Sequence, residues 1–235
     1  MPIMFEKRQL VTPGELLAEG DYLAGENAFF ESGKIYAARM GLFDTNGKDV
    51  SVVALKGTYM PQVEDEVVGK IIDVGLYGWL VDISAPYPGV LHASDIFERS
   101  FNPQKDSLTE VFDLGDYVLA QVVSFDRTRD PVLTTRGSGF GKISHGHIIE
   151  IVPAKIPRLI GKKGSMVGML KAETGCQILI GQNGRVLVSG RRSEDEELAI
   201  LAIRKIEAEA HTRGLTDRVK SLIEEQKKSR GEVNG

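Results

Sequence analysis

Short apolar runs alternate with polar positions over the first 61 residues, and glycines interrupt them. Residues 34–38 and 50–55 are two such runs, and Asn46-Gly47 lies between them. Asn-Gly between apolar segments signals a hairpin, because both residues tolerate the positive φ of a type I′ turn. We therefore expect a small β domain over residues 1–61, of the sheet or sandwich type.

From residue 62 the apolar runs become longer and predict a separate domain over residues 62–140. A polar connection, residues 94–113, separates the third run from the fourth. Five strands at this spacing are typical of a small Greek-key barrel, which closes its sheet and so leaves no open edge. The predicted strands are residues 67–74, 79–83, 89–92, 117–123 and 131–135.

The hydrophobic period changes again over residues 141–213, where helices are predicted beside strands. Ser193 and Glu196 have the spacing of a capping box at the start of the last helix. That helix carries one apolar stripe, which we expect to be buried: Ala199, Ala202, Ile203, Ile206 and Ala210. The predicted order is β-α-α-β-β-α, with strand 147–152, helices 154–160 and 165–174, strands 176–180 and 185–189, and a helix from residue 193.

The last segment, residues 214–235, starts with a short helical pattern that includes Leu215, Val219 and Leu222. A polar tail follows from Glu224, and we expect it to be frayed. Taken together, the patterns predict a mixed α+β protein of several domains.

The composition excludes several classes of protein. Hydrophobic residues make up 42% and charged residues 26%, which excludes disordered and fibrous chains. The single cysteine, Cys176, excludes an internal disulfide and multi-cysteine metal sites. No apolar run reaches the ~18 residues of a membrane span, and Glu6, Lys7 and Arg8 stand where a signal peptide would be apolar. We expect a soluble, cytoplasmic protein without a membrane partner.

Charge is divided unevenly along the chain. Residues 1–140 hold 12 basic and 21 acidic side chains, a net charge of −9, and residues 141–235 hold 17 and 12, a net charge of +5. Residues 151–172 carry five basic side chains and no acidic one. This asymmetry favours contact with a polyanion on the C-terminal side, although a solvated basic face explains the counts equally well.

The segment Gly161-Lys162-Lys163-Gly164 lies between the two predicted short helices. Glycine allows a tight turn and close approach of a sugar–phosphate backbone. The first amides of the next helix form an anion site, and each lysine–phosphate contact adds salt-dependent affinity. A corner that needs glycine only for its geometry is the alternative, but it does not explain the two lysines. We expect apolar residues to line the groove beside this loop: Ile160, Met166, Leu170 and Ile178. Some of them must be ordinary core, and packing is the favoured role for Met166 and Met169.

Within the β-α-α-β-β-α order, this motif resembles the KH domain in its type I topology, over roughly residues 145–210. The resemblance implies a groove that clamps about four single-stranded nucleotides. It assigns RNA binding to seven residues: Arg158, Ile160, Gly161, Lys162, Lys163, Gly164 and Lys171.

The barrel region resembles the S1 domain, a five-stranded OB fold that binds single-stranded RNA. The resemblance lies in residues 68–71, 75–82, 89–94, 114–116 and 122–127. In that family an aromatic residue on the second strand and a histidine after the third stack on bases, which implies these roles for Tyr77 and His92. Stacking contributes ~1–3 kcal/mol per base.

Three further residues of the barrel region are candidates for RNA contact through the same resemblance. Trp79 is a second aromatic candidate, with burial inside the barrel as an equally weighted alternative. Arg127 and Arg129 lie in a turn where the family often keeps a basic residue, although Asp130 departs from its pattern.

No catalytic residue, metal site or cofactor is predicted. The carboxylates of residues 64–66 are adjacent on a strand entry and point in different directions, so they cannot jointly hold a metal. His145 and His147 could share a strand face, but no third ligand lies nearby in the sequence, and we expect an exposed pair. Cys176 lacks an evident base, which favours buried packing.

A small β domain, an S1-like barrel and one type I KH domain, in this order, resemble the RNA-binding cap subunits of the archaeal RNA exosome, the ribosomal-RNA-processing protein four family. Residues 11–16 and 33–36 also resemble its first domain. The resemblance implies that three copies sit on a hexameric ring of phosphorolytic subunits, docked through residues 1–61.

The resemblance also implies a role without catalysis, in which the cap recruits single-stranded RNA and threads its 3′ end toward the ring for degradation or processing. A stand-alone regulator of transcription or translation that uses the same two modules is the alternative, and an enzyme is a third and less favoured class.

Overall fold

The computed structural model describes residues 3–54, 57–97, 101–102, 106–126, 128–210, 212 and 214–233, with side chains to residue 229. The chain divides into two compact units, residues 1–57 and 58–235. Among the described residues, no helix is both long enough and apolar enough to cross a membrane.

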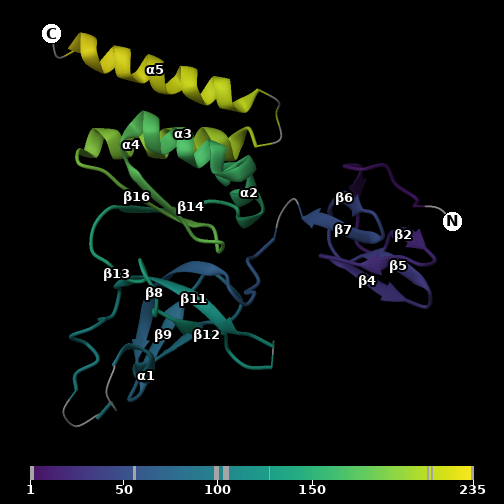
Figure 1. Ribbon diagram of the computed structural model, residues 1–235, viewed down its shortest axis with the longest axis horizontal. Coiled ribbons are helices and arrows are strands. Elements are labelled where there is room, and N and C mark those ends of the chain that lie inside the picture. Colours follow the sequence, from purple (N-terminus) through teal and green to yellow (C-terminus); the bar gives the residue numbers. More distant parts are fainter. Residues whose placement is uncertain are drawn as a thin grey trace. The chain divides into compact units, whose positions relative to one another are not determined.

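The first unit consists of two small sheets that share one core (Figure 1). One sheet has the order β1-β6-β7-β3 and the other β2-β5-β4. Val11, Leu17, Ile35, Phe43 and Val52 fill the space between them. The strands are β1 (Leu10–Val11), β2 (Leu16–Glu19), β3 (Leu23–Ala24), β4 (Ala28–Glu31), β5 (Lys34–Ala37), β6 (Gly41–Asn46) and β7 (Asp49–Ala54).

The hairpin expected around Asn46-Gly47 is present as β6 and β7, but its turn differs from the prediction. Asn46 pairs with Asp49, so Gly47 and Lys48 form the two-residue turn. Only Gly47 has a positive φ, of 67°. A type I′ turn needs positive φ at both central residues, so the turn belongs to another type.

The second unit begins with the closed five-stranded barrel that the sequence predicts. The sheet order is β12-β10-β9-β8-β11-β13, and pairing of β12 with β11 closes the barrel. Ile71, Trp79, Leu91, Val118 and Leu133 lie in its core. The elements are β8 (Glu66–Val74), β9 (Gly78–Asp82), β10 (Gly89–His92), α1 (Ala93–Ile96), β11 (Tyr117–Ser124), β12 (Val132–Thr134) and β13 (Gly141–Ile143).

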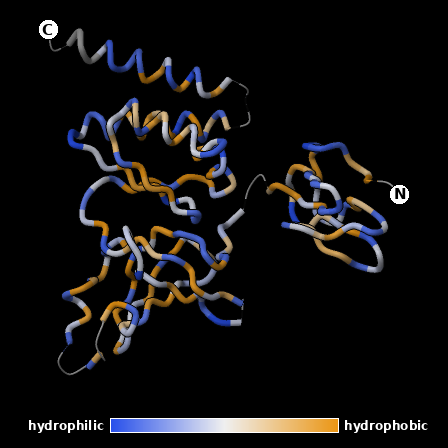
Figure 2. The backbone as a smooth tube through the Cα atoms, viewed as in Figure 1, coloured by the Kyte–Doolittle hydropathy of each residue, from blue (hydrophilic) through white to orange (hydrophobic). Residues whose placement is uncertain are grey.

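The rest of the second unit has the predicted β-α-α-β-β-α order, followed by an additional helix. Its antiparallel sheet has the order β14-β16-β15, and hydrophobic positions run along these strands (Figure 2). Helices α2, α3 and α4 cover one face of the sheet, and α5 packs on α3 and α4 (Figure 1). The elements are β14 (His147–Glu150), η1 (Pro153–Lys155), α2 (Ile156–Ile160), η2 (Lys162–Gly164), α3 (Ser165–Thr174), β15 (Gln177–Ile180), β16 (Arg185–Ser189), α4 (Ser193–Ala208) and α5 (Leu215–Val233).

Two local predictions in this part are wrong. Arg192, not Ser193, is the N-cap of α4, and it makes no side-chain cap bond. Glu196 instead accepts a hydrogen bond from the backbone N–H of Gly190, at 2.8 Å. The expected frayed tail is helical, since α5 continues to Val233.

The predicted stripe on α4 is buried over Ala199, Ala202, Ile203 and Ile206. Ala210 lies beyond the end of the helix and is half-buried. The core of this part therefore lies between one face of the sheet and the helices that cover it.

Candidate nucleic-acid interface

The Gly161–Gly164 corner connects α2 to α3 through a backbone that glycine makes possible. Gly161 has φ 75° and ψ 171°, a region that residues with a Cβ rarely adopt. A Cβ placed there would lie 2.7 Å from the backbone nitrogen of Met166. Gly164 is left-handed, with φ 77° and ψ 12°. Lys163 also has a positive φ, of 54°, which is uncommon for a lysine.

This corner presents charge and free hydrogen-bond donors at the surface. The side chains of Lys162 and Lys163 are exposed. The amide of Gly164 donates to the carbonyl of Gly161 at 3.1 Å, and the amide of Ser165 donates to Lys162. Within the described residues, the amides of Lys162 and Lys163 donate to no acceptor. Two ammonium groups and two open N–H groups can therefore meet an anion.

The other three candidates on the helices differ in how they relate to the corner. Arg158, three residues before Gly161, is exposed and donates from Nη2 to the carbonyl of Thr212 at 3.0 Å. Ile160 is half-buried and packs against the core. Lys171 is exposed in the last turn of α3; at 1.5 Å per residue it lies ~10 Å along the helix from Gly164. The corner and Lys171 therefore do not form one compact cluster.

The structure confirms packing in the core for Met166 and shows that Leu170 and Ile178, expected beside the loop, lie in the core as well. Met166, Leu170 and Ile178 are at most 3% exposed and belong to the core between the sheet and the helices. Ile160 alone of the four expected residues keeps part of its surface accessible. The three buried side chains hold α3 and β15 in place instead of contacting a ligand.

On the barrel, Tyr77 and His92 lie next to each other at the surface. His92 pairs with Gly78 at the end of β10, and the amide of Ala93 donates to the carbonyl of Tyr77 at 2.9 Å. The side chain of Tyr77 is 67% exposed, and His92 is exposed. The ring of Phe101 meets Tyr77 edge-on, with centroids 6.4 Å apart. The exposed ring of Tyr77, with Phe101 against it, offers a surface on which a base can stack, and the exposed His92 lies at the neighbouring backbone position.

Trp79 is not part of this surface, and its assignment to RNA binding is corrected. The side chain is 1% exposed, and Nε1 donates to the carbonyl of Phe112 at 2.8 Å. The two rings meet edge-on with centroids 5.3 Å apart. The large aromatic surface stabilises the barrel core, and its only polar atom is satisfied inside the protein.

Arg129 lies at the other end of the barrel strands from His92. Strands β10 and β12 run parallel, with Val90 opposite Val132, so the turn before β12 adjoins the start of β10. Arg129 is exposed in that turn, which the carboxylate of Asp126 organises; hydrogen bonds from Thr128 lower the pKa of Asp126. Arg127 lies outside the described residues.

A basic residue that the sequence reasoning missed, Arg136, lies at the His92 end instead. Its Nε and Nη2 donate to the carbonyls of Asp95 and Ser94, each at 2.8 Å. The Asp95 carboxylate accepts from Thr134 Oγ1 at 2.8 Å. Arg136 is 67% exposed and borders a cavity of about 590 Å³. The sequence offered one sign of this role, because Arg136 directly follows the last predicted strand of the barrel, residues 131–135.

The remaining candidates offer no catalytic or metal chemistry in the described residues. His147 Nε2 lies 3.4 Å from a carboxylate oxygen of Glu196, and no group of three or more metal-ligating side chains occurs in that part of the chain. Cys176 is buried, and burial raises the pKa of its thiol. A thiol with a raised pKa is a poor nucleophile.

Comparison with known proteins gives two domain matches and several similar whole chains. Residues 8–56 match the N-terminal domain of the exosome RNA-binding protein RRP4, and residues 146–194 match the KH domain. The chain is 44% identical over 230 residues to the exosome complex component Rrp4 of Thermofilum pendens, covering 97% of each chain. It is 43% identical over 236 residues to that of Saccharolobus solfataricus, covering 99% of this chain and 94% of the relative.

A solved structure is similar as well. The crystal structure of an exosome complex RNA-binding protein superposes with a TM-score of 0.71 at 44% identity, covering 74% of this chain and 99% of the other.

Proposed function

The chain belongs to the Rrp4 family of exosome complex components, and we propose that it is a non-catalytic RNA-binding cap subunit of an archaeal exosome. In this role it recruits single-stranded RNA and directs the 3′ end into a phosphorolytic ring. The observation that carries the proposal is the exposed Gly161–Gly164 corner, with two lysines and two open amides.

At this corner, RNA is held by its backbone. Phosphate oxygens accept hydrogen bonds from the open amides and face the ammonium groups of Lys162 and Lys163. Gly164 leaves room for the sugar–phosphate chain, because a Cβ there would meet no described atom within 4 Å. Because counterions leave the RNA when lysines replace them, affinity falls with rising salt. This contact is independent of base identity, which suits a protein that handles many RNAs.

On the barrel, bases stack on Tyr77 and His92, and Arg136 supplies a positive charge at the same end. Each of the two surfaces binds weakly alone. Linked in one compact unit, they gain affinity because the second contact becomes intramolecular. Contact of RNA with Arg127 and Arg129, in the turn before β12 at the other end of the barrel strands, stays a prediction. The domain boundaries after residues 140 and 213 also stay predictions.

The first unit docks the subunit to the ring, with three copies on a hexamer. Its surface supports this role, because Leu23 and Phe30 are 63% and 59% exposed on the contacting strands β3 and β4, and an exposed apolar patch marks a protein interaction site. Phe30 lies on β4, an edge strand of its sheet. The acidic balance of residues 1–140 is compatible with a protein-binding surface. A cytoplasmic location stays a prediction.

Charge reversal at the corner tests the proposal. The double variant Lys162→Glu and Lys163→Glu is expected to bind single-stranded RNA at least ten-fold more weakly, on the order of 1.4 kcal/mol, and to show a flatter dependence on salt. The matched control is Lys220→Glu with Lys228→Glu, two exposed lysines of α5. Equal losses in both variants, or wild-type affinity at the corner with native circular dichroism, would refute the clamp.

A further inference from the structure

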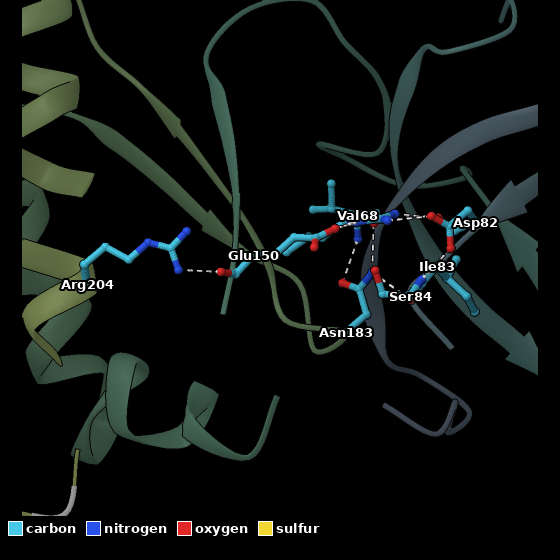
Figure 3. A network of polar contacts seen from close by, with 8 residues as sticks. Val68, Asp82, Ile83, Ser84, Glu150, Asn183 and Arg204 are labelled. Atoms are coloured by element: carbon cyan, nitrogen blue, oxygen red, sulfur yellow. Dashed lines mark hydrogen bonds and ion pairs between the residues drawn. The ribbon is translucent and has the colours of Figure 1, made fainter. Parts of the chain in front are cut away.

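The turn between β15 and β16 projects from the KH sheet onto the barrel. Asn183, in this turn, is 2% exposed. Its Nδ2 donates to the carbonyls of Val68 and Ile83 at 2.8 and 3.0 Å, and its Oδ1 accepts from the amide of Val68 at 3.2 Å. One amide side chain thus satisfies three backbone groups of the barrel (Figure 3).

Arg185, at the start of β16, connects both domains through its guanidinium. The side chain is 7% exposed, and Nη2 lies 2.5 Å from the carboxylate of Asp82 on the barrel. Its Nη1 donates to the Asp82 carbonyl at 2.6 Å, and its Nε to the carboxylate of Glu150 on β14 at 3.0 Å. Burial alone would lower the pKa of Arg185, but these two carboxylates outweigh it and raise the pKa.

These contacts fix orientation more than they add stability. Arg185 is buried, whereas the carboxylates of Asp82 and Glu150 are 39% and 69% exposed, so desolvation of the guanidinium and screening by solvent keep the net stability small. The bonds of 2.5 and 3.0 Å form only when Asp82 and Glu150 both lie beside Arg185, which constrains how the barrel and the KH sheet are oriented. The covalent connection is short as well, since residues 144–146 alone separate β13 of the barrel from β14. Glycine is required in the turn, because a Cβ on Gly181 would lie 2.4 Å from Asn183 Oδ1.

Each partner of Arg185 belongs to an element that also positions an RNA-binding group. Asp82 ends β9, and Tyr77 directly precedes the other end of that strand. Glu150 ends β14, which leads through η1 and α2 to the Gly161–Gly164 corner. The carbonyl of Glu150 also accepts from Arg204 on α4 at 2.7 Å (Figure 3).

We propose that Arg185, with Asn183, is a positioning residue that holds the Tyr77–His92 surface and the Gly161–Gly164 corner at one fixed separation, so that a single RNA strand engages both in a set register. This inference rests on the proposed function. Without the Arg185–Asp82 contact, the Asn183 bonds and the tether of residues 144–146 still keep both surfaces close, but their orientation is less restricted. The loss of affinity for long RNA is therefore about 3- to 10-fold, far below the ~10²–10⁴-fold gain that linkage can give.

The test uses the full chain with Arg185→Met or Asp82→Asn, and a ladder of oligoadenylates from about four nucleotides, the reach of one KH groove. The second variant removes the charge from the barrel side while keeping the shape of the side chain. As the oligoadenylate is lengthened, the affinity of wild type is expected to rise abruptly at the RNA length that reaches from the Gly161–Gly164 corner to the Tyr77–His92 surface. Both variants should reduce that step and bind the shortest RNA unchanged. Arg192→Met, which removes an exposed charge of the same domain, should match wild type.

Orientation is measured separately, without RNA. Spin labels at Val123→Cys on the barrel and Leu201→Cys on α4, both exposed positions, should give a narrow distance distribution that broadens in Arg185→Met and Asp82→Asn. Unchanged distributions, an unchanged step, or equal losses at all RNA lengths would each overturn the inference. Failure of wild type to bind any RNA would instead refute the proposed function, and the spin-label result would still stand.

Discussion

Replacing Gly161 or Gly164 by alanine should separate two reasons for glycine at the same corner. The conformation of Gly161, φ 75° and ψ 171°, is nearly restricted to glycine and costs ~1–3 kcal/mol for another residue. The added Cβ would also lie 2.7 Å from the backbone nitrogen of Met166. Overpacking of this kind costs a further ~1–3 kcal/mol, so Gly161→Ala should lose about 2–6 kcal/mol.

Gly164→Ala provides the contrast. Its left-handed conformation costs an L residue ~1–2 kcal/mol, but within the described residues a Cβ there meets no atom within 4 Å. Both variants keep Lys162 and Lys163. The difference between them therefore reports the close packing of Gly161 on α3.

The assay is urea unfolding of the full chain, followed by helical circular dichroism. The signal reports the KH part, because α3, α4 and α5 provide most of the helix. A domain is stable by only ~5–15 kcal/mol, so Gly161→Ala should shift the transition clearly. A loss for Gly161→Ala no greater than that for Gly164→Ala would show that the geometry of the corner has been misread.

Two further substitutions test the barrel surface and the docking surface. Tyr77→Ala should weaken RNA binding by ~1–3 kcal/mol, about 5- to 150-fold, with little loss of stability because the ring is exposed. Trp79→Phe should instead lower the unfolding free energy by ~1–3 kcal/mol and leave RNA affinity unchanged, because it leaves the carbonyl of Phe112 without its donor. Binding titrations and thermal melts on both variants measure the two effects. Selective loss of RNA binding in Trp79→Phe would disprove the assignment. Phe30→Asp should abolish co-purification with the ring in native mass measurements while RNA affinity is retained, whereas the exposed helix variant Leu201→Asp should still assemble. Intact assembly of Phe30→Asp would place docking elsewhere on the first unit.

The sequence predicts the strands of the barrel closely because its apolar runs are long and bounded by glycine and polar turns. The alternation of buried and half-buried positions along β9 also explains why Trp79 is buried. It shares a strand face with Val81, and both are buried, whereas Tyr77 precedes the strand and escapes that constraint. The resemblance to S1 domains left contact with RNA and burial equally weighted for Trp79, and the structure shows burial.

Other features depend on contacts that no local pattern encodes. Asn183 in its Gly-rich turn reads as a turn residue, and nothing nearby in the sequence indicates that it binds Val68, 115 positions away. The Ser193–Glu196 spacing fits a capping box, yet Glu196 bonds Gly190 instead because the preceding chain folds back within its reach.

The length of α5 was underestimated for a similar reason. Its buried stripe, Leu215, Val219 and Ile223, stops after the second turn, so the sequence marks only the first half. The polar half continues as helix, and Lys227 reaches Glu173 on α3, with the charged atoms 3.4 Å apart.

The turn around Asn183 also limits how these domains can be exchanged between proteins. A KH domain from another source, joined at residues 144–146, would retain its own fold but lack the groups that meet Val68 and Asp82. In such a chimaera the two domains would reorient independently about the short linker of residues 144–146. A functional graft therefore has to carry the strand ends of the barrel together with the hairpin of the KH domain.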